Sequence, residues 1–249
     1  MAVCFMAMEH FGRIVIEGGI LMTLPRGAMS DRDFAFLESM EDVLIAIGRM
    51  AFPIFCFFLV EGFLHTKHLK KYVFHLLLFA IISEPVYDLA FYGTGFTMEE
   101  QNVLFELLLC LVMMILQQRI LQMEGRVKWL FALFIAICAG YMAEVLHLDG
   151  GLFGVALVSV FYLFSGKRVT RVFAAALVII AASCYRVGGG FEFSFSNVLD
   201  VCVAMELVSL VLLNFYNHTR GFGWKYFFYL FYPLHLLLFS QVTGVLLEI

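Results

Sequence analysis

Long apolar stretches alternate with short polar connections along the whole chain. A helix that crosses a bilayer needs about 20 predominantly apolar residues, and nine segments approach that pattern. They are residues 2–23, 43–64, 71–92, 102–122, 127–146, 150–165, 169–187, 198–216 and 226–247. The sixth segment is short and follows the fifth through residues 147–151, which predicts a tight hairpin. The pattern predicts an all-α, polytopic transmembrane helix bundle with about nine spans.

The basic residues are concentrated in alternate connections. Eleven of the 16 Lys and Arg residues lie in four of them: Lys67, Lys70, Lys71, Arg119, Arg126, Lys128, Lys167, Arg168, Arg171, Arg220 and Lys225. Connections rich in Lys and Arg face the cytoplasm. The N-terminus is therefore expected in the cytoplasm and the C-terminus outside. The connections expected outside are acidic (24–42 and 93–100) or contain a triple glycine (186–197).

Composition agrees with a membrane protein. The 249 residues are 63% hydrophobic and 14% charged, with a mean hydropathy of +0.94, whereas a soluble domain is about half apolar and a quarter charged. We expect one integral membrane domain over residues 1–249. A net charge of -4 without a basic tail gives no indication of a nucleic-acid partner. The six cysteines form no CxxC pair, so neither a disulfide framework nor a metal site is expected.

The second span contains an arginine near one end and a glutamate near the other, Arg49 and Glu61. An ionisable side chain inside a bilayer costs about 2.5–3.5 kcal/mol or more, so it is expected to have a partner. Glu84 and Asp88 lie one turn apart in the outer half of the third span and are candidate partners for Arg49. Pro53 frees the carbonyl of Arg49 from its helical hydrogen bond, which predicts either a local site or a kink.

The first span carries Glu9, Arg13 and Glu17 at helical spacing, with His10 beside them. A histidine beside a carboxylate inside a membrane can act as a general base, because its unperturbed pKa is near 6.5. The alternative is an ion-pair ladder that neutralises itself, with His10 as a buried hydrogen-bonding group. The sequence leaves both interpretations open.

The outer ends of several spans contain further polar residues. These are Asn102, Glu106, Glu144, His147, Asp149, Asn197, Asp200 and Glu206. Their convergence predicts an outward-facing polar cavity. The last span places Tyr229, Tyr232 and His235 on one helix face, with His235 at about the depth of His10 and Pro233 expected to kink the helix. Zinc ligation is not favoured, because no His-x3-His spacing occurs.

Several of these stretches together resemble the TraX family. The second span reads GRMAFPIFCFFLVEG (48–62), and the others are SEPVYD (83–88), QNVLF (101–105), FYPLHL (231–236) and MEHFG (8–12). The last is similar to a family signature with aspartate where this chain has Glu9. That family is named for a protein that acetylates the N-terminus of conjugative pilin, and it is similar to the acyltransferase-3 group of integral membrane enzymes.

The resemblance implies a membrane acyltransferase of the bacterial cytoplasmic membrane. It implies that His10, Glu9 and Arg49 are catalytic, and that the substrate contacts are Glu84, Asp88, Asn102, Tyr232 and His235. The donor would be cytoplasmic acyl-CoA, with acetyl-CoA as the expected form, and neither a bound cofactor nor a metal is expected. The basic loops at 67–71 and 167–171 suit CoA phosphates. The acceptor would be a hydroxyl or amine at the outer side, on a glycan, a lipid or a protein N-terminus.

Two other functions remain open from the sequence. A proton-coupled transporter of small solutes would use the same intramembrane carboxylates and histidines, although neither an inverted repeat nor a matching pair of broken helices is visible. In a membrane scaffold without catalytic activity, the loss of Arg49 or Glu84 would lower the stability of the protein and would have no further effect.

Overall fold

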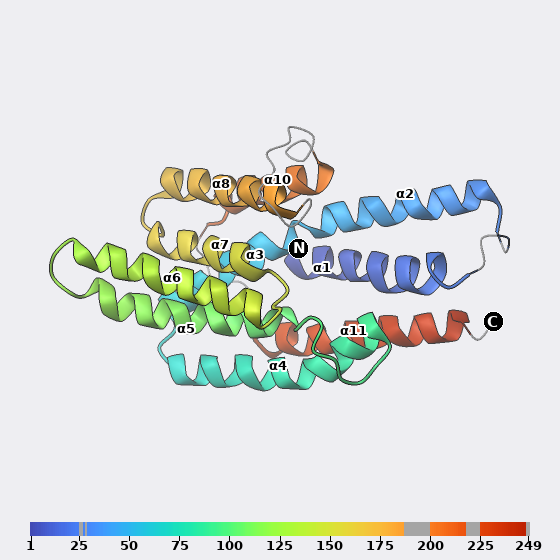
Figure 1. Ribbon diagram of the computed structural model, residues 1–249, viewed down its shortest axis with the longest axis horizontal. Helices are drawn as coiled ribbons and strands as arrows, with labels where there is room; N and C mark the ends of the chain where they lie inside the picture. Colours follow the sequence, from blue (N-terminus) through green and yellow to red (C-terminus); the bar gives the residue numbers. More distant parts are fainter. Residues whose placement is uncertain (25–26, 28, 187–199, 218–224, 248–249) are drawn as a thin grey trace. The chain divides into compact units, whose positions relative to one another are not determined.

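The computed structural model describes residues 1–24, 27, 29–186, 200–217 and 225–247, and every structural statement below concerns these residues. Figure 1 shows their helices along the chain. The sequence predictions for Asn197, Arg220 and the triple glycine fall outside the described residues.

The described residues form helices joined by short connections, without a named strand among them. The elements are α1 (Ala2–His10), η1 (Phe11–Leu21), α2 (Asp31–Gly48), α3 (Ala51–His65), α4 (Leu69–Tyr92), α5 (Val103–Leu121), α6 (Val127–Val145), α7 (Gly151–Leu163), α8 (Arg168–Arg186), α10 (Val201–Asn214) and α11 (Lys225–Leu247). The all-α prediction is therefore confirmed.

Six helices in the described part of the chain are long and apolar enough to cross a membrane. They are Asp31–His65, Leu69–Tyr92, Val103–Leu121, Val127–Val145, Arg168–Tyr185 and Phe227–Leu246. The remaining three predicted spans correspond to shorter apolar helices, α7 and α10, and to the charged α1–η1 segment. The six helices indicate a multi-pass membrane protein, and the count of nine is not confirmed.

The acidic stretch 24–42 was expected to be a loop, and that prediction is wrong for its second half. Helix α2 begins at Asp31, twelve residues before the apolar run predicted to start at residue 43. Ser30 caps it, because the Ser30 side chain accepts a hydrogen bond from the Asp33 backbone N–H at 3.2 Å. Asp31 and Asp33 in the first turn also suit the positive end of the helix dipole. Capping chemistry therefore extends the helix beyond its apolar part.

The helix predicted across Arg49 and Pro53 is interrupted. Helix α2 ends at Gly48, residues 49–50 form a turn, and α3 begins at Ala51. Proline lacks an N–H and cannot bond to the carbonyl four residues earlier, which is that of Arg49. Pro233, by contrast, lies inside a continuous α11.

The helices group into two units, which are described separately. Unit one contains residues 1–52, 82–97 and 199–249. In it, α1 and η1 pack along α2 and against α11, while α10 packs on α2. Figure 1 shows α1 and η1 lying beside α2. Thr243 on α11 donates a hydrogen bond to the carbonyl of Ile14 at 3.1 Å, which ties the last helix to η1.

Unit two contains residues 53–81 and 98–198. In it, α5, α6 and α7 pack on one another and α7 packs on α8. The predicted hairpin of α6 and α7 is confirmed. The buried Gln117 side chain on α5 donates to the carbonyl of Ala132 on α6 and to the hydroxyl of Ser159 on α7, each at 3.1 Å. Such bonds between helices stabilise membrane bundles, where the hydrophobic effect gives little drive for helix association.

Gly48 permits a close approach of α2 to α1. A Cβ atom built on Gly48 would overlap the Cβ of Glu9 and lie 2.9 Å from the Glu9 backbone N and Cα. Because backbone atoms cannot rotate away, any larger residue would push the two helices apart. Small residues serve the same purpose in many membrane helix pairs.

We expect Gly48→Ala to lower the free energy of unfolding by about 1–3 kcal/mol, the usual cost of overpacking. Thermal unfolding of the purified protein in detergent measures it. Gly244→Ala is the matched control, because a Cβ at this glycine of α11 meets nothing within 4 Å. Equal unfolding temperatures for the two variants would contradict the close approach.

Candidate functional site

Two histidines from α1 and α11 contact each other in unit one. Nδ1 of His10 lies 2.7 Å from Nε2 of His235. The two ring planes differ by 7° and the ring centroids are 4.9 Å apart. The centroids are farther apart than the two nitrogens by about twice the distance from a ring's centre to its nitrogen. This is possible only if the two nitrogens lie between the rings and point at each other. The rings therefore lie edge to edge, in the geometry of an N–H···N hydrogen bond.

The other ring nitrogen of His235 has its own partner. Its Nδ1 lies 2.7 Å from the carbonyl oxygen of Phe231, one turn earlier on α11. A carbonyl oxygen only accepts hydrogen bonds, so Nδ1 of His235 carries the proton and donates. His235 is 5% exposed. Its two nitrogens are therefore both engaged inside the protein.

Aromatic side chains surround the histidine pair. The ring of Phe231 lies nearly parallel to that of His235, with centroids 4.8 Å apart, and Phe239 meets His235 edge-on at 5.7 Å. The predicted substrate residue Tyr232 lies 6.1 Å from His10 and 5.8 Å from His235, between ring centroids. Phe91 of α4 meets His10 edge-on at 5.6 Å. The pair therefore lies in a mostly apolar enclosure.

Glu9 forms the charged part of the same unit. Its Oε1 lies 3.4 Å from a terminal nitrogen of Arg13 and 3.7 Å from Nε of Arg49. The carboxylate therefore joins α1 to η1 and to the end of α2. The pairing of Glu9 with Arg13 follows from the i, i+4 spacing in the sequence, whereas no sequence signal indicated Glu9 as a partner of Arg49. The catalytic roles of Glu9 and Arg49, and the pairing of Arg49 with Glu84 or Asp88, stay predictions.

The third predicted span contributes buried acids to unit one. On α4, Glu84 is 7% exposed and Asp88 is fully buried. Asp88 Oδ2 accepts a hydrogen bond from the backbone N–H of Thr97 at 2.9 Å, which anchors the connection after α4. Asp88 Oδ1 is also buried, and no hydrogen-bond partner for it occurs among the described residues. The ring of Phe91 on this helix contacts the ring of His10 and also that of Tyr87, one turn earlier on α4. Phe91 therefore links α4 to His10.

Asn102 belongs to unit two, where it has a structural role. Its side-chain oxygen accepts from the backbone N–H of Leu104 at 3.0 Å and caps α5. Its amide nitrogen donates to the carbonyl of Ala80 on α4 at 3.0 Å. Both polar atoms of this buried side chain are thus engaged. The predicted substrate contact of Asn102 stays a prediction.

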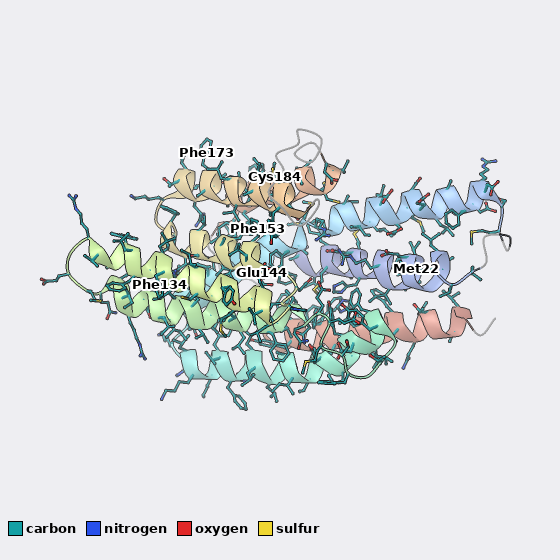
Figure 2. All side chains as sticks on the ribbon, in the orientation of Figure 1. Met22, Phe134, Glu144, Phe153, Phe173 and Cys184 are labelled. Atoms are coloured by element: carbon teal, nitrogen blue, oxygen red, sulfur yellow. The ribbon has the colours of Figure 1, made fainter. Side chains whose placement is uncertain are left out.

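Unit two also contains an acidic cavity of about 400 Å³. Its polar lining consists of Glu99, Glu100, Glu144, His147, Asp149 and Tyr185. Figure 2 labels Glu144 and Phe153, which lie on the two helices that meet at this cavity. Of the polar residues predicted to converge, Glu144, His147 and Asp149 line this cavity, all from the α6–α7 hairpin, and a convergence of several spans stays a prediction. Sequence reasoning missed Tyr185, which lies in an apolar span without any distinguishing spacing.

Two carboxylates hold the start of α7 at the cavity. Glu144 accepts a hydrogen bond from the backbone N–H of Leu152 at 2.7 Å, and Glu106 accepts from that of Gly150. The first N–H groups of a helix have no partner within it, so both acids satisfy an exposed donor. Gly151 has a φ of +55°, a conformation that favours glycine. Both acids therefore hold the hairpin, and Glu144 also lines the cavity.

The basic loops expected to bind CoA phosphates differ in their exposure. Exposed side chains occur at Lys67, between α3 and α4, and at Lys70 and Lys71, in the first turn of α4. Arg171, in contrast, is 7% exposed, and its guanidinium lies 5.0 Å above the centroid of the Phe57 ring. A cation held on an aromatic face is engaged in packing. Arg171 therefore does not belong to an exposed phosphate site.

Comparison with known proteins gives two findings. The family model described as "TraX protein" matches residues 1–243. A curated relative from Dichelobacter nodosus, "Probable fimbrial assembly protein FimC, serogroup H1", is 31% identical over 201 residues, which are 77% of this chain and 79% of the relative. No solved structure matches the chain.

The ion pair of Glu9 with Arg49 predicts that the two residues contribute to stability in a coupled way. Glu9→Gln and Arg49→Gln should each destabilise the protein, because each leaves a partly buried charge without this partner. The double variant should lose less free energy of unfolding than the two single variants lose together. The difference should be about 0.5–3 kcal/mol, the range for residues in contact. Thermal unfolding of the four proteins completes the cycle. Arg32→Gln, at an exposed position on α2, replaces Arg49→Gln in the control cycle; equal coupling in both cycles would contradict the ion pair.

Proposed function

This chain belongs to the TraX family, and from that premise we propose that it is a membrane acyltransferase. It moves an acyl group, most simply acetyl, from cytoplasmic acyl-CoA to a hydroxyl or amine of an acceptor at the outer side. The observation that carries the proposal is the contact of His10 with His235 inside an aromatic enclosure. A histidine that is held by a neighbour and lies among apolar side chains suits general-base catalysis.

The reaction is written with His10 as the base. His10 takes the proton of the acceptor hydroxyl or amine, and the freed oxygen or nitrogen attacks the acyl carbon. The C–S bond of acyl-CoA breaks, a C–O or C–N bond forms, and the proton passes to the CoA sulfur. Arg49, beside Glu9, stabilises the negative charge that develops on the acyl oxygen. Glu84, Asp88, Asn102, Tyr232 and His235 complete the proposed contacts with the substrates.

The acceptor is proposed by class. The name of the Dichelobacter nodosus relative refers to fimbrial assembly, which favours a protein subunit that is exported across the membrane and acetylated at its N-terminus. A glycan or a lipid would present the same nucleophilic groups. The buried Oδ1 of Asp88, which has no hydrogen-bond partner among the described residues, suits a donor group of such an acceptor.

The proposed topology places the chemistry across the bacterial cytoplasmic membrane. The N-terminus lies in the cytoplasm and the C-terminus outside, with α1–η1, α7 and α10 as three further crossings beside the six long helices. The loops rich in Lys and Arg then face the cytoplasm. In that orientation Lys67, Lys70 and Lys71 are on the side from which acyl-CoA arrives.

We expect His10→Ala to abolish turnover in a protein that still folds, because the group that takes the proton of the acceptor is lost. The measurement is release of free CoA from acetyl-CoA by the purified protein in detergent, with peptides and glycans offered as acceptors. His65→Ala is the control, because His65 is exposed at the end of α3. Full activity in the folded His10→Ala variant would contradict the role of His10. Solute flux driven by a pH gradient in proteoliposomes without acyl-CoA would instead support a transporter.

Replacing Lys67, Lys70 and Lys71 together by Gln should raise the KM for acetyl-CoA about tenfold and leave kcat within about twofold, because their charges act on the CoA phosphates in the bound state. The effect should shrink as salt is added. Arg32→Gln serves as the control from a connection predicted to face outward. An unchanged KM in the triple variant would exclude this loop from donor binding.

A further inference from the structure

We propose that His235 fixes the tautomer of His10, so that Nε2 is the atom of His10 that accepts the proton of the acceptor. His235 is thus a positioning residue that also relays the proton. The tautomer itself follows from geometry alone, whereas its catalytic use rests on the proposed function. Neither the spacing of the residues in the sequence nor the family resemblance assigns this arrangement.

The assignment begins at a backbone carbonyl. The oxygen of Phe231 can only accept, so Nδ1 of His235, 2.7 Å away, carries a hydrogen. In a neutral imidazole one nitrogen carries the hydrogen and the other is an acceptor. Nε2 of neutral His235 therefore has a lone pair directed at Nδ1 of His10, 2.7 Å away. His10 must then donate from Nδ1, which leaves its Nε2 unprotonated and basic.

The geometry of the rings supports this chain of hydrogen bonds. The planes of His10 and His235 differ by only 7°, and the nitrogens point at each other along the line between the rings. Nitrogen lone pairs and N–H bonds lie in the plane of an imidazole ring, so a coplanar arrangement aligns donor and acceptor. A face-to-face stack, in contrast, would direct neither group at its partner.

The aromatic enclosure keeps the arrangement in place. Phe231 lies against one face of His235, and Phe239 meets the ring edge-on. Rotation of the His235 ring by half a turn would place carbon atoms at both partners, and the turning ring would have to pass through the space that Phe231 occupies. Two adjacent imidazolium ions in such surroundings would repel each other strongly. The pair therefore holds one added proton at a time.

The relay balances in protons. The acceptor gives its proton to Nε2 of His10 while its oxygen or nitrogen bonds to the acyl carbon. His10 passes its Nδ1 proton to Nε2 of His235, so the positive charge moves to His235 and His10 becomes the opposite neutral tautomer. When the C–S bond breaks, His10 returns its Nε2 proton to the CoA sulfur and recovers the Nδ1 proton from His235. Both residues end in their starting states.

The tautomer is tested without any activity measurement. Protein labelled with ¹⁵N in the histidine rings is studied by NMR in lipid nanodiscs under alkaline conditions, and the seven histidines are assigned with single His→Gln variants. The expected spectrum shows His10 protonated at Nδ1 and unprotonated at Nε2, the less common tautomer of free histidine. In His235→Phe, His10 should revert to the common tautomer, protonated at Nε2. Protonation of wild-type His10 at Nε2 would overturn the proposal.

The relay is tested by steady-state kinetics. His235→Gln places an amide oxygen near the position of Nε2, so it accepts from His10 but takes no proton. His235→Phe removes both functions. We expect kcat to fall about 100-fold or more in His235→Phe and by a smaller factor in His235→Gln, with the KM for acetyl-CoA unchanged within about twofold in both. His65→Gln is the matched control on α3.

The outcomes separate the two proposals. A wild-type protein that releases no CoA with any acceptor contradicts the proposed function, and the NMR spectrum still decides the tautomer. A tautomer as expected, together with full kcat in His235→Phe, would overturn the relay. Equal losses in His235→Gln and His235→Phe that follow their unfolding temperatures would indicate a purely structural contact, and they would overturn it too.

Discussion

An ionisable side chain on an apolar helix needs a partner, because a bilayer or a protein interior solvates a lone charge poorly. In unit one this constraint joins the helices. Glu9 pairs with Arg13 and Arg49, so one carboxylate connects α1, η1 and the end of α2. The contact between His10 and His235 connects α1 to α11. The first and last segments of the chain are thus held together by the same groups that are candidates for the chemistry.

The backbone around His10 is unusual in a way that suits a site. Helix α1 ends at His10 and continues as the π-helix η1 from Phe11, where the N–H of Met22 bonds to the carbonyl of Glu17 five residues earlier. π-Helical turns are rare and frequently occur at functional sites. Here the change in helical winding follows directly after the histidine. His10 therefore lies at the junction of two helix types as well as at the contact with α11.

The two units satisfy their polar groups differently. In unit one, apart from the hydrogen bond of Thr243 to Ile14, the polar contacts that connect helices involve ionisable side chains, and those of the histidine pair lie next to aromatic rings. In unit two they are mostly hydrogen bonds to backbone atoms, such as those of Gln117 and Glu144. Side chains that bond to backbone atoms of another helix have little freedom to change partner during a reaction. Unit one therefore contains the better candidates for chemistry, and unit two the better examples of structural support.

The sequence by itself determined the helical class and most of the segments that form helices, and it predicted that Pro53 disturbs the helix at Arg49. It also indicated His10, Arg49 and His235 as ionisable residues within apolar runs. Apolar length, proline and ionisable residues within apolar runs are local properties, so they can be read along the chain. Only the tertiary structure decided that Nδ1 of His10 faces His235, that Glu9 is a partner of Arg49 and that Asn102 caps α5. The start of α2 at Asp31 also escaped prediction, because capping and charge, not apolar length, extend that helix. Partners on distant segments are chosen by packing, and helical periodicity gives the face of a residue without giving the helix that will cover it.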